Sequence, residues 1–148
     1  RHQVLPRLPE SHRFEIDETL GGNKAPLSVR LQFLKRHLEG LTCIEVTPKL
    51  SVATLAVQLG VPRRVVSTYR NLEEGAHARE EFLEALSEKF GIFIYERDIR
   101  KLSTNLTSFD AFLCAFTALL ADTQQCARPP TGFPTASGWI PYPQLPAP

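Results

Sequence analysis

The chain has 148 residues, of which 43% are apolar and 22% charged, a length and composition that suit one globular domain with its own core. The net charge of +1 gives no overall attraction to nucleic acid or to an anionic membrane, although a local basic patch is compatible with it. No apolar run approaches the roughly 18 residues that span a bilayer. The three cysteines match no zinc spacing, and we expect a cytoplasmic protein without a membrane span.

The N-terminal part, residues 1–26, is interrupted by prolines and glycines and is expected to be irregular. Leucines then recur at the spacing of one helix face, and they predict a helix over about 26–39 that ends at Gly40. These residues are Leu27, Leu31, Leu34 and Leu38. The chain contains no methionine and begins at Arg1, so we expect it to be a fragment, a processed chain or a truncated reading frame.

The next elements alternate between a strand-like run and helices. Residues 41–46 read as a short buried strand that ends at Pro48. Ser51 is the expected cap of a helix that runs to residue 59. Arginines and a tyrosine follow as the most basic patch of the chain, and a second helix is predicted over about 73–90. The patch comprises Arg63, Arg64, Tyr69 and Arg70.

The last third of the chain contains a short apolar run, a helix and a proline-rich tail. Residues 92–95 fit a short strand or a buried loop equally well, and residues 98–102 fit one helical turn. A helix capped by Thr107 or Ser108 is predicted to continue to about Asp122. Prolines make the tail, 127–148, extended, and its apolar segment 138–143 is expected to dock on the body.

Two carboxylates lie on apolar elements. Asp110 begins a helix that is otherwise apolar nearly all round, and Glu45 lies within the strand-like run. A buried charge without a partner is costly, so Asp110 should be paired, should cap the helix or should bind a cation. Two such acids that are far apart in the sequence suggest one common site.

The mixture of elements indicates the α/β class. The predicted strands are too few for a complete sheet, so the fold should be helix-rich and lack its N-terminal strands. An incomplete sheet exposes an edge, for which a homodimer or a partner chain is a plausible cover.

The order of motifs over about residues 42–143 resembles the family called domain of unknown function 429, whose members are predicted nucleases of ribonuclease H-like fold. The motifs in chain order are Glu45-Val46-Thr47-Pro48, Tyr69-Arg70-Asn71, Ala78-Arg79, Asp110-Ala111, Cys114-Ala115, Thr117-Ala118 and Gly138-Trp139-Ile140-Pro141. Thr47 replaces a tyrosine of the family pattern and Ser137 a glutamate. The family begins with a strand that bears an aspartate, and no such strand precedes residue 27. We therefore expect the chain as it stands to lack one essential carboxylate and to be weak or inactive as a nuclease.

The resemblance implies a domain, 27–126, that hydrolyses phosphodiesters with Mg²⁺ or Mn²⁺. In such nucleases two ions held by carboxylates activate water and stabilise the leaving oxygen. Glu45 would be the middle-strand ligand and Asp110 the last-helix ligand, and both would be catalytic. Arg70, Arg79 and Tyr69 would bind nucleic acid, because guanidinium groups pair with phosphates.

Simpler interpretations stay open for each of these residues. Asp110 suits a helix start without any metal, since the helix dipole favours its charge there. Glu45 would then form a salt bridge, the arginines would be solvated, and Tyr69 would pack in the core. In that case the chain is a non-catalytic module that binds nucleic acid or protein, or a helical scaffold with structural acids.

Overall fold

The computed structural model describes residues 34, 37–38, 40–134 and 138–144. Within these residues the chain forms five helices and no strand, apart from one isolated antiparallel bridge between Cys126 and Pro143. The helices are α3 (Pro48–Leu59), α4 (Arg63–Thr68), α5 (Gly75–Phe90), α6 (Glu96–Thr104) and α7 (Leu106–Asp122). The predicted helix-rich character is confirmed, but the described residues contain no strand that would support the α/β class. The helix predicted over 26–39 lies almost entirely outside the described residues.

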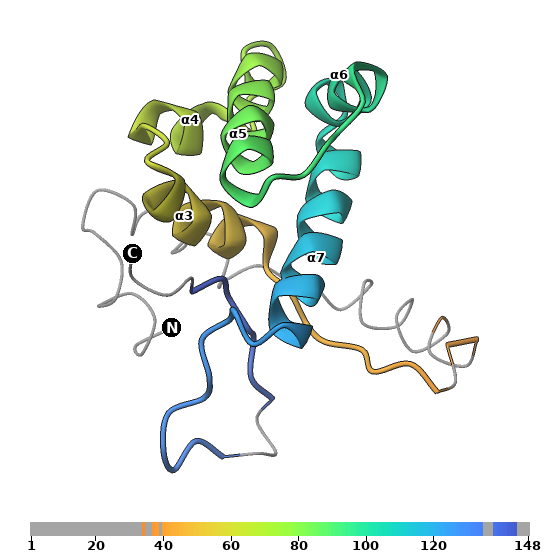
Figure 1. Ribbon diagram of the computed structural model, residues 1–148, viewed down its shortest axis with the longest axis vertical. Coiled ribbons are helices and arrows are strands. Elements are labelled where there is room, and N and C mark those ends of the chain that lie inside the picture. Colours follow the sequence, from red (N-terminus) through yellow and green to blue (C-terminus); the bar gives the residue numbers. More distant parts are fainter. Residues whose placement is uncertain (1–33, 35–36, 39, 135–137, 145–148) are drawn as a thin grey trace.

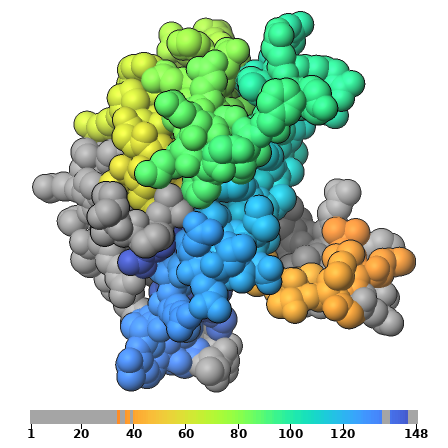
Figure 2. Space-filling view, in the orientation of Figure 1, coloured from red at the N-terminus to blue at the C-terminus, as the bar shows by residue number. Residues whose placement is uncertain are grey.

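The strand predicted over residues 41–46 is wrong. This segment is extended, but it pairs with no neighbouring strand in the described part, and residues 41–45 are exposed. Burial begins only at Val46 and Thr47, directly before α3. Figure 2 shows the described residues before α3, coloured orange, projecting from the helical body. A short apolar run indicates burial in a strand only where a partner covers it, and none does among the described residues.

Helix α3 lies at the centre of the core because it is apolar on nearly every side. Pro48 occupies its first turn, where the missing N–H leaves no hydrogen bond unmade. The helix ends at Gly60, whose φ of 69° is left-handed and whose N–H donates to the Ala56 carbonyl. Ser51, the predicted cap, instead lies inside the helix, where its buried Oγ accepts a hydrogen bond of 2.9 Å from Thr117 of α7.

Helices α5 and α7 pack on this centre with aromatic side chains. Phe82 of α5 and Phe109 of α7 meet edge to face with ring centroids 5.8 Å apart, and Phe90 meets Phe116 in the same way at 4.9 Å. Such pairs add to the free energy gained by burial. Figure 1 shows α5 between α4 and α6, in agreement with the contacts between these helices.

The remaining helices differ from the prediction mainly at their ends. Helix α5 begins at Gly75, and the predicted turn at 98–102 is the longer helix α6. Helix α7 reaches Asp122 as predicted, but its cap is Asn105, whose side chain accepts the Ser108 N–H at 2.9 Å. Residues 92–95 form an extended connection outside any strand. The short helix α4 was not predicted.

The tail docks on the helices as predicted for its segment 138–143. Trp139 donates its indole N–H to the Ala127 carbonyl at 2.9 Å, and Tyr142 is buried. Gln58 of α3 donates to the Pro143 carbonyl at 3.0 Å, which ties this part of the tail to the central helix. The segment 138–143 therefore packs against the core.

Candidate functional site

Asp110 lies in the second turn of α7 and forms an ion pair. Its Oδ2 accepts a hydrogen bond of 2.9 Å from Arg70 Nη1, and its side chain is 23% exposed. The other oxygen, Oδ1, is buried and has no hydrogen-bond partner among the described residues. The first turn of α7 contains no acid and Asn105 caps the helix, so Asp110 is neither the cap nor the first-turn charge. Of the three roles expected from the sequence, pairing is the one observed.

Arg70 reaches Asp110 from the turn that follows α4. Its guanidinium carbon lies 5.7 Å from the centre of the Tyr69 ring, within the range of a cation–π contact. Burial lowers the pKa of Arg70, but its interactions with the Tyr69 and Asp110 side chains outweigh that effect, so the pKa is raised. With 37% of its side chain exposed, Arg70 remains accessible to an anion from solvent.

Arg79 of α5 lies beside this pair but faces inward. Only 3% of the residue is exposed. Its Nε donates to the Ser103 carbonyl at 2.5 Å, and its Nη1 donates to the Tyr69 carbonyl. Burial lowers the pKa of Arg79, the charge of Asp110 opposes this, and the charge of Arg70 adds to it. The charges of Asp110 and Arg70 therefore both affect the pKa of Arg79, although Arg79 forms no ion pair with a described residue.

Tyr69 is part of the core. The residue is 1% exposed, and its ring packs against that of Phe109 with centroids 5.8 Å apart. This placement corresponds to the packing interpretation, because a ring so buried has no face open to a base. Four residues selected from three motifs thus lie close together, and we call them the Arg–Asp cluster: Tyr69, Arg70, Arg79 and Asp110.

Glu45 is not part of the Arg–Asp cluster as described. It is exposed on the extended segment before α3, and it forms no hydrogen bond or ion pair with any described residue. The salt bridge expected for it is therefore not seen there. No group of three or more histidine, cysteine or acidic side chains in the described part is arranged to hold a metal ion. Asp110 Oδ1 suits one hard cation, but the described residues alone do not fit the implied two-metal site.

Other predicted candidates have structural surroundings. Arg64 pairs with Glu81 at 2.8 Å, across α4 and α5. Cys114 follows Asp110 by one turn of α7, and burial together with the charge of Asp110 raises its pKa. Burial raises the pKa of Cys126 to about 11. Neither thiol is therefore activated as a nucleophile, since nucleophilic cysteines need a lowered pKa.

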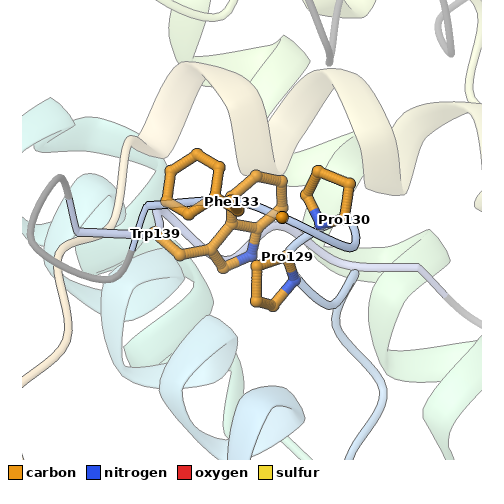
Figure 3. Close-up of a pocket in the computed structure, with 5 residues that line it drawn as sticks. Pro129, Pro130, Phe133 and Trp139 are labelled. Atoms are coloured by element: carbon orange, nitrogen blue, oxygen red, sulfur yellow. The ribbon is translucent and has the colours of Figure 1, made fainter.

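A pocket lies in the tail, and no acid, histidine or cysteine is among its lining residues. Figure 3 shows Trp139 and Phe133 facing Pro129 and Pro130 around it, and Gly132 completes the lining. The Phe133 and Trp139 rings meet edge to face at 5.1 Å. A pocket of prolines and aromatic rings offers apolar contact but no acid, base or nucleophile, so it is not a catalytic site.

Sequence reasoning missed Gly75, Ser103 and Asn105. Asn105 had a usable signal, because asparagine is a preferred cap and the apolar spacing of α7 begins directly after it. Gly75 and Ser103 had no such signal, since each lies against Arg79 only in the folded chain.

No single described helix is long and apolar enough to cross a bilayer. Helices α6 and α7 reach that length and apolar character only when taken together, and they are bent by 114° relative to each other.

Comparisons of the chain with protein families, with curated proteins and with solved structures gave no match. The resemblance described above therefore depends on its motifs, and the function has to be argued from the geometry of the Arg–Asp cluster.

Proposed function

We propose that the chain is part of a metal-dependent, nuclease-like domain of ribonuclease H-like fold that acts on phosphodiesters. The observation that supports this proposal is the convergence of Tyr69, Arg70, Arg79 and Asp110. The motif comparison selected these residues from three separate segments, and they meet around one ion pair. Of these residues, Arg70 and Asp110 form the ion pair, and Tyr69 and Arg79 pack beside it.

In this proposal Asp110 and Arg70 have complementary roles. Asp110 Oδ1, which has no hydrogen-bond partner among the described residues, is a hard oxygen ligand of the kind that Mg²⁺ and Mn²⁺ prefer. Arg70 has a partly exposed side chain whose guanidinium suits a phosphate oxygen. When bound, the metal would supply charge stabilisation at the phosphate. Further ligands, with Glu45 as the predicted one, would have to join Asp110, and we derive no catalytic step from the described residues.

A manganese titration by calorimetry tests the role of Asp110. The wild-type chain, Asp110→Asn and the control Asp122→Asn, on an exposed acid of the same helix, are titrated with and without a short DNA or RNA oligonucleotide. We expect saturable binding that Asp110→Asn abolishes and Asp122→Asn retains. Binding equal in all three proteins, or none in either condition, contradicts the proposal.

A second candidate is a non-catalytic module that binds nucleic acid. It is favoured by the lack of a three-ligand group among the described residues, because Arg70 needs no metal to bind a phosphate. Oligonucleotide binding followed by fluorescence anisotropy in EDTA tests it. We expect binding that Arg70→Gln weakens, with a salt dependence reduced by about one phosphate contact. A complex that forms only with metal contradicts this candidate.

The prediction of a homodimer or a partner chain rested on an open sheet edge. The described residues form no sheet and so expose no such edge. Light scattering of the purified chain over a range of concentrations tests it directly. A single species of monomer mass would contradict a dimer.

A further inference from the structure

Arg79 is a buried cation whose charge is balanced in an unusual way. It forms no ion pair with any described acid, although it is only 3% exposed. Its guanidinium instead donates to two backbone carbonyls, those of Tyr69 and Ser103. A buried charge needs such compensation, because desolvation otherwise disfavours it strongly. These two bonds therefore account for its presence in the core.

Both carbonyls lie at the C-terminal ends of helices. Tyr69 is the residue that ends α4, and Ser103 lies in the last turn of α6. The last carbonyls of a helix have no partner within it and carry its partial negative charge, so a guanidinium there is favourable. Arg79 thereby joins α5 to the ends of two other helices.

These two ends lead directly to the ion pair. Arg70 follows Tyr69 in the chain, and α7, which carries Asp110, begins three residues after Ser103. The two bonds of Arg79 thus fix, from a single side chain, the backbone that presents Arg70 and the helix end that precedes Asp110. Displacing Arg79 would release both at once.

Gly75 makes room for this arrangement. A Cβ added at Gly75 would lie 2.6 Å from Arg79 Nη1 and 2.7 Å from the Tyr69 carbonyl oxygen. Real Cβ atoms do not approach so closely, so any side chain here would displace the guanidinium or the carbonyl. Gly75 is also the first residue of α5 and has no left-handed φ, so this contact is the structural reason for a glycine.

We propose that Arg79, with the space left by Gly75, is a positioning residue that holds Arg70 against Asp110 and does not itself bind phosphate. Of the two arginines predicted to bind nucleic acid, only Arg70 is available to a ligand, with 37% of its side chain exposed against 3% of Arg79. The part of this proposal that concerns phosphate rests on the proposed function, and the part that concerns positioning does not.

A double-mutant cycle tests the positioning without any ligand. The coupling between Arg70→Gln and Asp110→Asn is measured by urea unfolding in four backgrounds: wild type, Arg79→Lys, Gly75→Ala, and the remote core variant Phe116→Leu as a control for general destabilisation. We expect coupling in the wild type and the control, and its loss in the other two. Coupling that survives in Arg79→Lys and Gly75→Ala overturns the proposal.

Oligonucleotide binding tests the absence of a phosphate contact. We expect Arg79→Lys to weaken binding severalfold when Arg70 is present and to have no further effect in Arg70→Gln, because it acts through Arg70. Independent losses that multiply in the double variant overturn the proposal. A wild-type chain that binds no oligonucleotide overturns the proposed function, and the cycle then decides the positioning alone.

Side-chain NMR of the wild-type chain gives a test that needs no variant to fold. We expect the Arg79 Nε–H to exchange slowly with solvent and to keep its chemical shift when inorganic phosphate or an oligonucleotide is added, while the Arg70 signal moves. An Arg79 signal that exchanges rapidly, or that shifts with the ligand as Arg70 does, overturns the proposal.

Discussion

Replacing Gly75 by alanine gives a sharp prediction, because two physical effects oppose each other. Alanine normally stabilises a helix by up to about 1 kcal/mol relative to glycine where the backbone φ and ψ suit it, as they do here. The added Cβ, however, would meet Arg79 Nη1 at 2.6 Å and the Tyr69 carbonyl at 2.7 Å. The outcome depends on which effect is larger.

The steric effect should be the larger one. A hydrogen bond to a charged group contributes about 1.5 to 3 kcal/mol, and moving Arg79 weakens two of them while it leaves buried carbonyls unpaired. After the helical gain is subtracted, we expect Gly75→Ala to lower the free energy of unfolding by about 2 to 5 kcal/mol. A substitution that ordinarily stabilises a helix should therefore destabilise this chain.

Urea unfolding followed by circular dichroism measures this difference, with Gly60→Ala as the matched control. Gly60 has a left-handed φ of 69° but open space around an added methyl group, so its substitution should cost about 1 to 2 kcal/mol from backbone strain alone. Backbone conformation alone ranks Gly60 as the more sensitive glycine, whereas the Arg79 contact ranks Gly75 first. A Gly75→Ala variant as stable as the wild type would refute the reasoning.

Three further predictions concern α7 and the tail. Asp110→Asn should lower the pKa of the Cys114 thiol, which shows as faster alkylation at moderately alkaline pH in a chain whose other cysteines are replaced; an unchanged profile would contradict the proximity of the two groups. Asn105→Ala should cost about 1 kcal/mol in urea unfolding because it removes a cap, while the exposed neighbour Thr107→Ala should change stability by less than about 0.5 kcal/mol. Folding raises the pKa of the Cys126 thiol from 9.0 to about 11, so its contribution to the free energy of unfolding is complete below pH 9 and is lost as the pH rises toward 11. In urea unfolding at several pH values between 9 and 11, Cys126→Ser should lose less stability with rising pH than the wild type. An equal loss in both proteins would contradict this prediction.

The helices that could be predicted from the sequence are those whose apolar spacing is long enough to be unambiguous. Helices α5 and α7 are 16 and 17 residues long, and their apolar spacing locates both ends closely. Helix α4 has six residues, only two of them buried, and β-branched side chains that do not favour a helix. The short run before α3 fits a strand or an exposed extended segment equally well, because only a neighbouring part of the chain decides between them.

The candidate site was predictable in part. The sequence showed that Asp110 needed a partner, because a carboxylate on an apolar helix is costly without one. It did not show that the partner is Arg70, which lies 40 positions earlier and is brought there by the packing of its neighbour Tyr69 on Phe109 of α7. The burial of Arg79 was unexpected, since arginines are mostly exposed. Backbone carbonyls at the ends of two helices compensate its charge, and no sequence pattern indicates that both lie within reach of Arg79.

The charges of the Arg–Asp cluster bear on how a metal and a phosphate would bind. Two guanidinium groups surround one carboxylate, and Arg70 already occupies one of its oxygens. A divalent cation approaching Asp110 Oδ1 would be repelled by both arginines, which weakens its net attraction to the single acid. A phosphate that drew Arg70 toward itself would bring the missing negative charge and leave Asp110 less neutralised. Cation binding at Asp110 should therefore be stronger with an oligonucleotide than without one. The manganese titration compares these two conditions. Tighter binding with the oligonucleotide indicates a site that the substrate completes, and no binding in either condition indicates an ion pair that is purely structural.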